Sequence, residues 1–239
     1  MIELVVYPDA HPEVTSVDGY VQHKAGFLGS DGMTWADLLT NAGIGGAFDD
    51  EQYAFCGFQA STTINQWNTL IRSMLLFDTS SIPVGAIIVS AILSLYGAGK
   101  FDTLSSAPTI NVFSSLPASD TQLVTADFLT IGDTSLCDTD LSYADFDITD
   151  FNNFTFNASG KAAITKAGIT KLAIRNVNYD LAAIAPPWVS GSKSSYVYWY
   201  QAKEGGGYRP KLTITYRVRK GNIHIDQLKY QHVERMQVR

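Results

Sequence analysis

Short runs of alternating apolar and polar residues dominate the chain, and turn residues separate them. Such alternation is typical of β-strands that cover a core with one face. In the clearest case, Lys211–Val218, every second residue is apolar and the residues between them are Lys, Thr or Arg. The pattern predicts strands at Ser73–Phe77, Ile87–Tyr96, Thr109–Phe113, Lys171–Arg175, Tyr196–Tyr200 and Lys211–Val218.

The helix signals are short and peripheral. Thr34 and Asp37 have the spacing of a capping box, and Gly43 can end the helix that follows. A second candidate helix covers Ser159–Ala167, with Gly168 directly after it. Neither helix carries a long apolar stripe, and the strands do not alternate with helices. We therefore expect an all-β fold, an antiparallel β-sandwich with a few short peripheral helices.

The chain changes character after Val218. Gly221 and Asn222 interrupt the alternation, and the apolar residues beyond them fit either a helix, at spacing three or four, or short strands. We expect residues 1–216 to form the sandwich domain. Residues 217–239 should form a basic C-terminal arm, for which helix and strand both remain open.

Charge is unevenly distributed between these two parts. The formal net charge is −6, but from Arg217 onward six Lys and Arg residues stand against two acidic ones, so the arm carries +4 and residues 1–216 carry −10. An acidic body lacks the basic face that nucleic acid requires, whereas a basic arm suits an acidic protein surface. The residues predicted to contact a protein partner are Arg217, Arg219, Lys220, Ile223, Ile225, Leu228, Arg235 and Met236.

The placement of the histidines argues against several enzyme classes. His11 and His23 lie near the start and His224 and His232 near the end, which leaves residues 24–223 without a histidine. A Ser/His/Asp or Cys/His site would need its base from a terminus, and a His/Cys zinc site has almost no ligands. No pair of carboxylates is recognisable as the acid and nucleophile of a glycosidase. We predict that the protein is not an enzyme.

Signals for membrane insertion, export and redox compartment are weak. The longest apolar stretch, around Ile82–Leu95, is interrupted by proline, glycine and serine and falls short of the ~20 residues of a membrane-spanning helix. The first residues lack the basic segment and apolar core of a classical signal peptide. Cys56 and Cys137 allow one disulfide at most, and the sequence leaves their pairing open.

Residues 72–96 carry a family resemblance. A strand ends in Phe77-Asp78, the turn T-S-S-I-P follows, and the next strand has the form A-x-L-x-L-Y at residues 91–96. Together with the closing strand at 209–216, these segments resemble DNRLRE-type jelly-roll domains, which occur in bacterial surface proteins and phage structural proteins. Some of them are grouped with carbohydrate-binding modules. The resemblance covers about residues 1–216. It implies a jelly-roll sandwich, and members of this type are not enzymes as a class.

The turn of this segment has a physical explanation of its own. Pro83 presets the backbone where the chain reverses, and Asp78 can accept backbone N–H groups from the turn at Thr79–Ser81. We therefore interpret Asp78 as a brace of the turn and not as a catalytic acid.

Aromatic residues near the end of the domain are candidates for binding a glycan. In a strand, Tyr196, Tyr198 and Tyr200 share one face, and the residues between them share the other. One face should belong to the core, so the remaining face suits a glycan platform or a protein interface, where Tyr and Trp are enriched. Trp188, after two prolines, is a further candidate. For any single ring, burial in the sandwich is the competing interpretation.

A run of aspartates is a candidate calcium site. Six carboxylates fall between Asp133 and Asp150, and clustered oxygen ligands suit Ca²⁺. We take Asp138, Asp140 and Asp145 as the candidate ligands, although the spacing does not match an EF-hand. Solvated loop acids between core aromatics explain the run equally well. No other cofactor is expected.

These features together predict a non-enzymatic structural protein of a phage-like virion, either a capsid decoration protein or another exterior component. Its arm would attach it to other virion proteins or to sister subunits, so we expect a homo-oligomer. The alternative is a carbohydrate-binding module of a cell-surface or polysaccharide-degrading protein, located outside the cell or on its surface. In that case the partner would be a glycan, such as one on a host surface.

Overall fold

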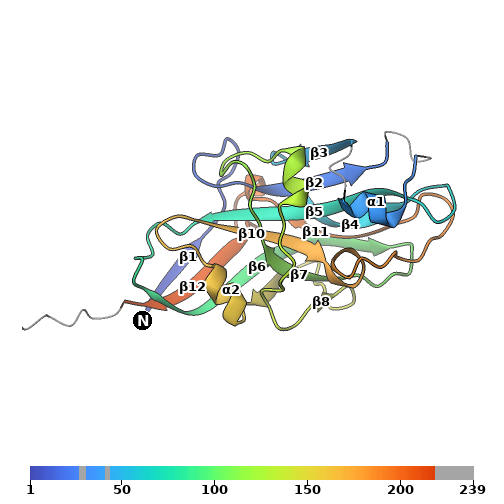
Figure 1. Cartoon of the computed structure of the whole chain (residues 1–239). Coiled ribbons are helices and arrows are strands. Elements are labelled where there is room, and N and C mark those ends of the chain that lie inside the picture. Colours follow the sequence, from blue (N-terminus) through green and yellow to red (C-terminus); the bar gives the residue numbers. More distant parts are fainter. Residues whose placement is uncertain (27–30, 41–43, 219–239) are drawn as a thin grey trace, which may run out of the picture.

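The computed structural model describes residues 1–26, 31–40 and 44–218 of the chain (Figure 1). The predicted all-β fold is confirmed, because strands make up 44% of the structure and helices 12%. The strands are β1 (Ile2–Val6), β2 (Asp18–Lys24), β3 (Ile44–Phe48), β4 (Tyr53–Ala60), β5 (Trp67–Asp78), β6 (Ile87–Asp102), β7 (Thr109–Ser114), β8 (Leu141–Ser142), β9 (Phe151–Thr155), β10 (Ile169–Asn176), β11 (Ser194–Tyr200) and β12 (Lys211–Arg217). The helical turns are α1 (Trp35–Thr40), η1 (Thr125–Leu129), α2 (Ala158–Ala163), η2 (Val177–Leu181) and η3 (Ala202–Glu204).

The strands form one curled antiparallel sheet, in the order β1-β12-β6-β11-β4-β5-β10-β7-β8. β2 pairs with β5 and β3, and β9 pairs with β6. The long strand β6 pairs with β12 and β9 along its first half and with β11 along its second half, so it belongs to both layers. The sheet therefore folds over on itself into the predicted jelly-roll-like sandwich (Figure 1).

The main core lies inside this curl. It joins side chains of β5, β7 and β10 to side chains of β6, β9, β11 and β12. Its largest member is the fully buried Trp199 of β11. The one-sided covering expected for the last strand is confirmed for Leu212, Ile214 and Tyr216, whereas Val218 lies beyond the end of β12 and is 49% exposed.

A second core covers the other face of β5. Leu70, Met74 and Leu76 of β5 pack with Trp35 and Leu38 of α1 and with residues of β2, β4 and η1. All residues of β5 except the last are therefore buried. Such burial on both faces explains the nearly continuous apolar run of this strand.

The first predicted helix is confirmed as α1. Thr34 and Asp37 form its expected cap, with 2.6 Å between the Thr34 hydroxyl and the Asp37 carboxylate. The buried His23 of β2 holds this helix, because its Nδ1 donates to the carbonyl of Leu38 at 2.7 Å. Burial lowers the pKa of His23, and the nearby Arg72 lowers it further. The imidazole is therefore neutral when it carries this hydrogen bond.

The second predicted helix is shorter than the sequence pattern indicated. α2 begins after Asn157, whose side chain accepts the backbone N–H of Gly160 at 2.9 Å, and it ends at Ala163. The next residue, Ile164, is buried in the main core and extended, so core packing stops the helix before the expected Ala167. The predicted turn brace is confirmed, because Asp78 accepts the N–H of Ser80 at 2.9 Å.

A buried ion network ties these layers together. The Asp180 carboxylate of η2 accepts two hydrogen bonds from Arg72 of β5, at 2.6 and 2.8 Å, and one from Arg175 of β10 at 3.0 Å. Arg72 also donates to the carbonyl of Phe128 at 2.7 Å and lies over its ring. Asp180 and Arg72 are almost completely buried. The fixed geometry of these bonds offsets the cost of removing the charges from water.

We predict that Asp180→Asn lowers the free energy of unfolding by about 3–5 kcal/mol, because it leaves two guanidinium groups without their buried counter-charge. Urea denaturation followed by circular dichroism measures the change. The control is Asp120→Asn, which removes a surface pair with Lys171 (2.6 Å). It should cost less than about 1 kcal/mol. Equal losses in the two variants would contradict a special role for the buried network.

A candidate binding face of aromatic side chains

Aromatic side chains gather on one face of the sheet formed by β3, β2, β5, β4, β11 and β6. Residues that lie opposite each other on neighbouring strands point to the same face. Tyr198 of β11 lies opposite Phe55 of β4, and Tyr196 lies opposite Phe101 of β6. Farther along the sheet, Tyr20 of β2 lies opposite Phe48 of β3. The register thus aligns rings from five strands.

These rings touch one another in a continuous network. Tyr20 and Phe48 are stacked with centroids 4.7 Å apart, and Phe55 and Tyr198 with centroids 5.1 Å apart. Most of the other pairs meet edge to face or tilted, as aromatic pairs prefer. We call this network the aromatic face; its members are Tyr20, Phe48, Tyr53, Phe55, Tyr96, Phe101, Phe151, Tyr196, Tyr198, Tyr200 and Tyr208.

The aromatic face meets solvent. None of its members is fully buried, and Phe101 and Tyr208 are 40% and 42% exposed. In β11 the residues between the tyrosines, Val197 and Trp199, are buried in the main core. The expectation that one face of this strand belongs to the core is therefore confirmed, and the three tyrosines occupy the other face.

Two glycines leave room for the tyrosine rings. Gly57 of β4 lies opposite Tyr196, and a Cβ atom there would come within 2.5 Å of the Tyr196 ring. Gly99 of β6 lies opposite Tyr198, and a Cβ atom there would collide with the Tyr198 phenol. The rings therefore lie across their neighbouring strands and not away from the sheet. This arrangement lets the rings of neighbouring strands touch one another.

Four phenols of the aromatic face have a raised pKa. Burial raises the pKa of Tyr20 to about 12, with a smaller effect of Glu51. Burial likewise raises the pKa of Tyr53, Tyr96 and Tyr196. At neutral pH these hydroxyl groups remain protonated and can donate as well as accept hydrogen bonds. The face therefore offers apolar rings and uncharged polar groups to a ligand.

Acidic residues lie beside the part of the aromatic face that contains Tyr53, Tyr96 and Tyr200. Asp50 binds Lys203 at 2.8 Å, and Glu204 accepts a hydrogen bond from Gln52 at 3.1 Å, both next to the end of β11. Asp147 and Asp150 act electrostatically on Tyr96, whose ring contacts Tyr200 at the end of β11. The ammonium group of Lys211 lies over the Phe151 ring at 3.9 Å. In this part of the rim, the acidic groups Asp50, Glu204, Asp147 and Asp150 outnumber the two cations, Lys203 and Lys211.

Trp188 does not join the three tyrosines with which it was predicted. It is half-buried and packs against the second core, and its indole N–H donates to the carbonyl of Ser61 at 3.1 Å. The structure brings Tyr196, Tyr198 and Tyr200 together and places Trp188 elsewhere. The sequence prediction omitted Tyr20, Phe48, Phe55 and Phe101. The alternation of aromatic and small residues in Tyr53–Ala60 was a signal that could have identified part of this set.

The predicted calcium ligands do not converge. Asp140 accepts a hydrogen bond from Asn111 at 2.6 Å, and Asp145 accepts one from Ser142 at 2.6 Å. In the part of the chain that the structure describes, no three His, Cys, Asp or Glu side chains form a group that could hold a metal ion. Calcium binding by Asp138, Asp140 and Asp145 stays a prediction.

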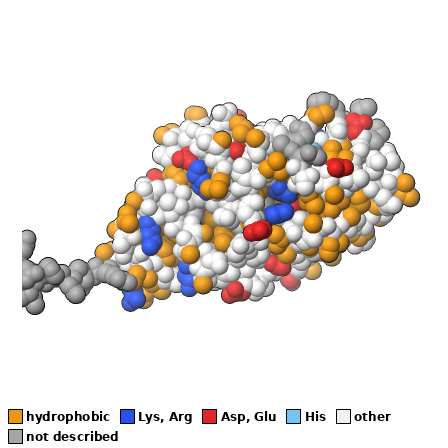
Figure 2. All heavy atoms as spheres, in the orientation of Figure 1, with side chains coloured by type: hydrophobic (Ala, Val, Ile, Leu, Met, Phe, Trp, Pro, Cys, Tyr) orange, Lys and Arg blue, Asp and Glu red, His pale blue; other side chains and the backbone are white. Residues whose placement is uncertain are grey.

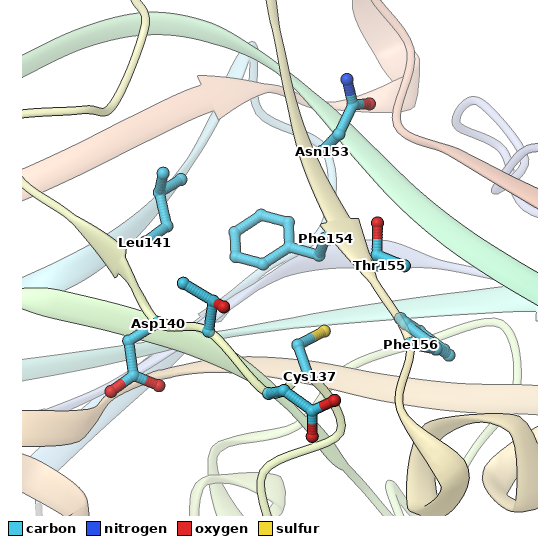
Figure 3. Close-up of a pocket in the computed structure, with 9 residues that line it drawn as sticks. Cys137, Asp140, Leu141, Asn153, Phe154, Thr155 and Phe156 are labelled. Carbon is cyan, nitrogen blue, oxygen red and sulfur yellow. The ribbon is translucent and has the colours of Figure 1, made fainter.

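A pocket of about 370 Å³ lies between residues 137–141 and residues 153–156 (Figure 3). The ring of Phe154 projects between the two segments toward Leu141. Cys137 lines this pocket, and both Cys56 and Cys137 are free buried thiols, which resolves their open pairing. Burial raises the pKa of Cys137 to about 12, so the thiol is protonated and poorly nucleophilic at neutral pH.

The described histidines make structural contacts. His11 lies 2.9 Å from the Glu13 carboxylate, and His23 is buried beneath α1. His224 and His232 lie outside the described residues, as do all the predicted partner-binding residues of the arm except Arg217, which is exposed at the end of β12. None of the helices in the described residues is long and apolar enough to cross a membrane.

Comparison with protein-family models and with curated proteins gives no relative. No protein-family model matches the sequence, and no curated protein matches it. The resemblance to DNRLRE-type domains therefore rests on the residues quoted for it.

The buried Asp18 links the start of β2 to the segment that follows β11. It begins β2, and its carboxylate accepts the backbone N–H of Ala202, just after β11, at 3.0 Å. Burial raises the pKa of Asp18 to about 8, and Glu13 and Asp49 contribute to the increase. An unfolded aspartate titrates near 3.9. The folded chain therefore keeps a proton at Asp18 that the unfolded chain releases between these two pH values.

We predict that Asp18→Asn removes a pH dependence of stability. The stability associated with the protonated Asp18 is fully present below about pH 4 and is lost as pH rises toward 8, with a limiting slope of about 1.4 kcal/mol per pH unit. Thermal and urea unfolding between pH 5 and pH 8.5 should show this decline in the natural chain and a flatter profile in Asp18→Asn. Parallel profiles would contradict the assignment. Glu51→Gln, in an exposed position, is the matched control, and its stability should decline with pH as in the natural chain.

Proposed function

We propose that the protein is a non-enzymatic structural component of a phage-like virion, either a capsid decoration protein or another exterior component, attached through residues 217–239. The observation that supports this proposal is a group of exposed apolar side chains beside the end of β12, the strand that precedes the arm. Ile2 pairs with Tyr216, and Ile87 pairs with Arg217, so the start of β1 and the start of β6 lie beside the end of β12.

This end of the sandwich exposes apolar side chains. Met1 is 92% exposed and Ile2 is 48% exposed. Val84, Val89 and Val218 are exposed close by along the same strands or in the turn before β6. Figure 2 shows hydrophobic and basic side chains together where the arm begins. Exposed apolar groups beside a basic segment are typical of a surface that contacts another protein.

The aromatic face lies away from the attachment end. Along β6, Ile87 pairs with the last residue of β12, and Tyr96 of the aromatic face follows nine residues later. At 3.3 Å per residue, this is a separation of about 30 Å. One end can therefore bind a particle or a sister subunit while the aromatic face stays accessible.

We predict that a chain ending at Val218 folds but loses attachment. Circular dichroism and unfolding should match the full chain, because β12 is complete at Arg217. Co-sedimentation with purified particles should fall at least about tenfold, the effect of losing ~1.4 kcal/mol. Part of the affinity of the full chain should decrease with salt, since the arm carries +4.

Arg219→Gln with Lys220→Gln is the matched control for charge: it should remove much of the salt dependence and retain a residual affinity. The attachment role is wrong if the truncated chain sediments with particles as well as the full chain does. The attachment role is equally wrong if truncation unfolds the sandwich, because the arm would then be part of the sandwich of its own chain.

A second candidate function is carbohydrate binding, as in a carbohydrate-binding module of a cell-surface or polysaccharide-degrading protein. The aromatic face favours it, because flat rings suit the apolar faces of sugars and neutral phenols suit their hydroxyl groups. The acidic rim, with Asp50, Glu204, Asp147 and Asp150, would repel an anionic chain. The structure therefore favours a neutral polysaccharide over an acidic one.

We predict that Phe101→Ala weakens binding to a neutral polysaccharide by about tenfold, the loss of ~1.4 kcal/mol expected for one exposed stacking ring. A glycan array identifies the neutral ligand, and titration calorimetry measures the change. Tyr7→Ala is the matched control, because Tyr7 is 38% exposed but packs with Arg209 outside the aromatic face. Carbohydrate binding is excluded if the array shows no neutral glycan, or if both variants weaken binding equally.

A further inference from the structure

The sandwich has an open seam on the side opposite β12. In residues 1–26, 31–40 and 44–218, β9 pairs with β6 alone and β8 pairs with β7 alone. One isolated bridge, between Cys137 and Phe156, joins the two sides. Beyond this bridge the two segments separate around the pocket of about 370 Å³ (Figure 3). We call this gap, between residues 137–141 and residues 153–156, the seam.

The seam presents a free strand edge. In an antiparallel pair, the backbone groups of successive residues point alternately toward the partner and away from it. About half of the N–H and C=O groups of β9 therefore point away from β6 and toward the seam. An edge of this kind accepts an added strand, because the incoming backbone satisfies these groups.

The side chains of the seam define the strand that it would accept. Phe154 and Phe156 of the β9 side are buried and form an apolar floor, with Leu141 opposite. Asp138 and Asp140 lie on the other side and are exposed. A complementary segment has apolar residues at alternate positions and basic residues next to them. The pocket in the seam has a volume of about 370 Å³, at the small end of the ~300–1,000 Å³ range of ligand pockets. The seam therefore fits a short segment.

The arm of this chain contains such a segment. Ile223 and Ile225 are apolar residues at alternate positions, and Arg219 and Lys220 precede them. In an added strand, both isoleucines would point to the apolar floor and the residue between them, His224, would point outward. The basic pair would lie near Asp138 and Asp140. The charge of the arm, +4, also complements the −10 of residues 1–216.

The direction of β12 favours a second copy of the chain over the chain's own arm. β12 runs antiparallel to β6 and ends opposite Ile87, whereas β9 lies along Ile92–Tyr96 on the other side of β6. β12 thus points away from the seam of its own molecule, and the arm follows β12 in the sequence. A neighbouring molecule can receive it without a reversal of the chain.

We propose that the seam receives residues 219–225 of a second copy of this chain as an added β-strand, with Ile223 and Ile225 against Phe154 and Leu141. Each molecule would then donate one arm and accept another, which is a heterologous contact that builds a ring or an open chain. This inference rests on the proposed role of the arm as an attachment device, and it names the sister subunit as the partner.

Disulfide trapping between full-length chains tests this contact. One chain carries Thr155→Cys, on the exposed side of β9, and the other carries His224→Cys. Asn222→Cys covers a register shifted by two residues. Cys137 lines the same pocket as Thr155, so every chain in this test also carries Cys137→Ala, whereas Cys56 is fully buried with a raised pKa and is a poor competitor. After mild oxidation of an equimolar mixture, we expect a disulfide-linked heterodimer in at least about tenfold higher yield than with Thr63→Cys, an exposed threonine outside the seam.

A single chain that carries both Thr155→Cys and His224→Cys separates the two possible donors. Linked dimers and larger species support a second copy. A monomer closed by an internal disulfide overturns the proposal, because the arm would then occupy its own seam. Asp138→Lys should lower the yield of the heterodimer severalfold at low salt and less at high salt, since it repels Arg219 and Lys220.

The proposal is also overturned if neither His224→Cys nor Asn222→Cys links to Thr155→Cys above the Thr63→Cys level. If the chain ending at Val218 still loses particle attachment in that case, the attachment role stands and the arm binds another virion protein. If the heterodimer forms but truncation leaves particle attachment unchanged, the arm joins sister subunits and the attachment role is wrong. The two proposals therefore fail independently.

Discussion

The contact of Asp180 with Arg72 and Arg175 is the interaction on which the layered architecture depends. It joins β5, β10 and η2. Arg72 lies on β5 between the residues that pair with β4 and the residues that pair with β10. Arg72 extends the network to η1 through the Phe128 carbonyl. A buried carboxylate with two guanidinium groups is stable only when each hydrogen bond is made, so it allows one arrangement of these elements. Both cores lie against β5 in that arrangement.

One sheet forms the main core, the second core and the aromatic face, because its strands change neighbours along their length. β5 separates the main core from the second core, and β6 continues from the attachment end to the aromatic face. Gly57 and Gly99 leave space beneath the tyrosine rings of β11. The chain thus builds an exposed face without losing the core residues of the same strand, since Val197 and Trp199 stay buried. Because successive side chains of a strand point to opposite faces, the residues of β11 that can bind a ligand alternate with those that form the core.

The period of two was sufficient to predict the fold class, six of the twelve strands in the described residues, and the split of β11 into a tyrosine face and a core face. It failed where glycines carry no pattern: the predicted strand ended at Tyr96, yet β6 continues through Gly97 and Gly99 to Asp102. The structure gives the reason, because a side chain at Gly97 would collide with the Asp147 backbone and one at Gly99 with Tyr198. Such contacts join residues far apart in sequence.

The candidate site was predictable only in part for the same reason. Tyr196, Tyr198 and Tyr200 are neighbours in sequence, so their common face follows from local geometry. Phe55 and Tyr20 join them through strand pairing that no local pattern specifies. Trp188 has the right chemistry, but its indole is held by the carbonyl of Ser61 on another surface. Residue type identified the aromatic candidates, and only the register determined which of them meet.

The pairing of β12 has a mechanical consequence. This strand is hydrogen-bonded to β1 on one side and to β6 on the other, and the arm continues directly from its end. A pull on the arm therefore acts along the axis of β12, perpendicular to hydrogen bonds on both of its sides. These bonds are loaded together in shear and do not open one after another. The attachment of β12 to the sandwich therefore resists a pulling force on the arm. The force is transmitted through β6 to both layers of the sandwich.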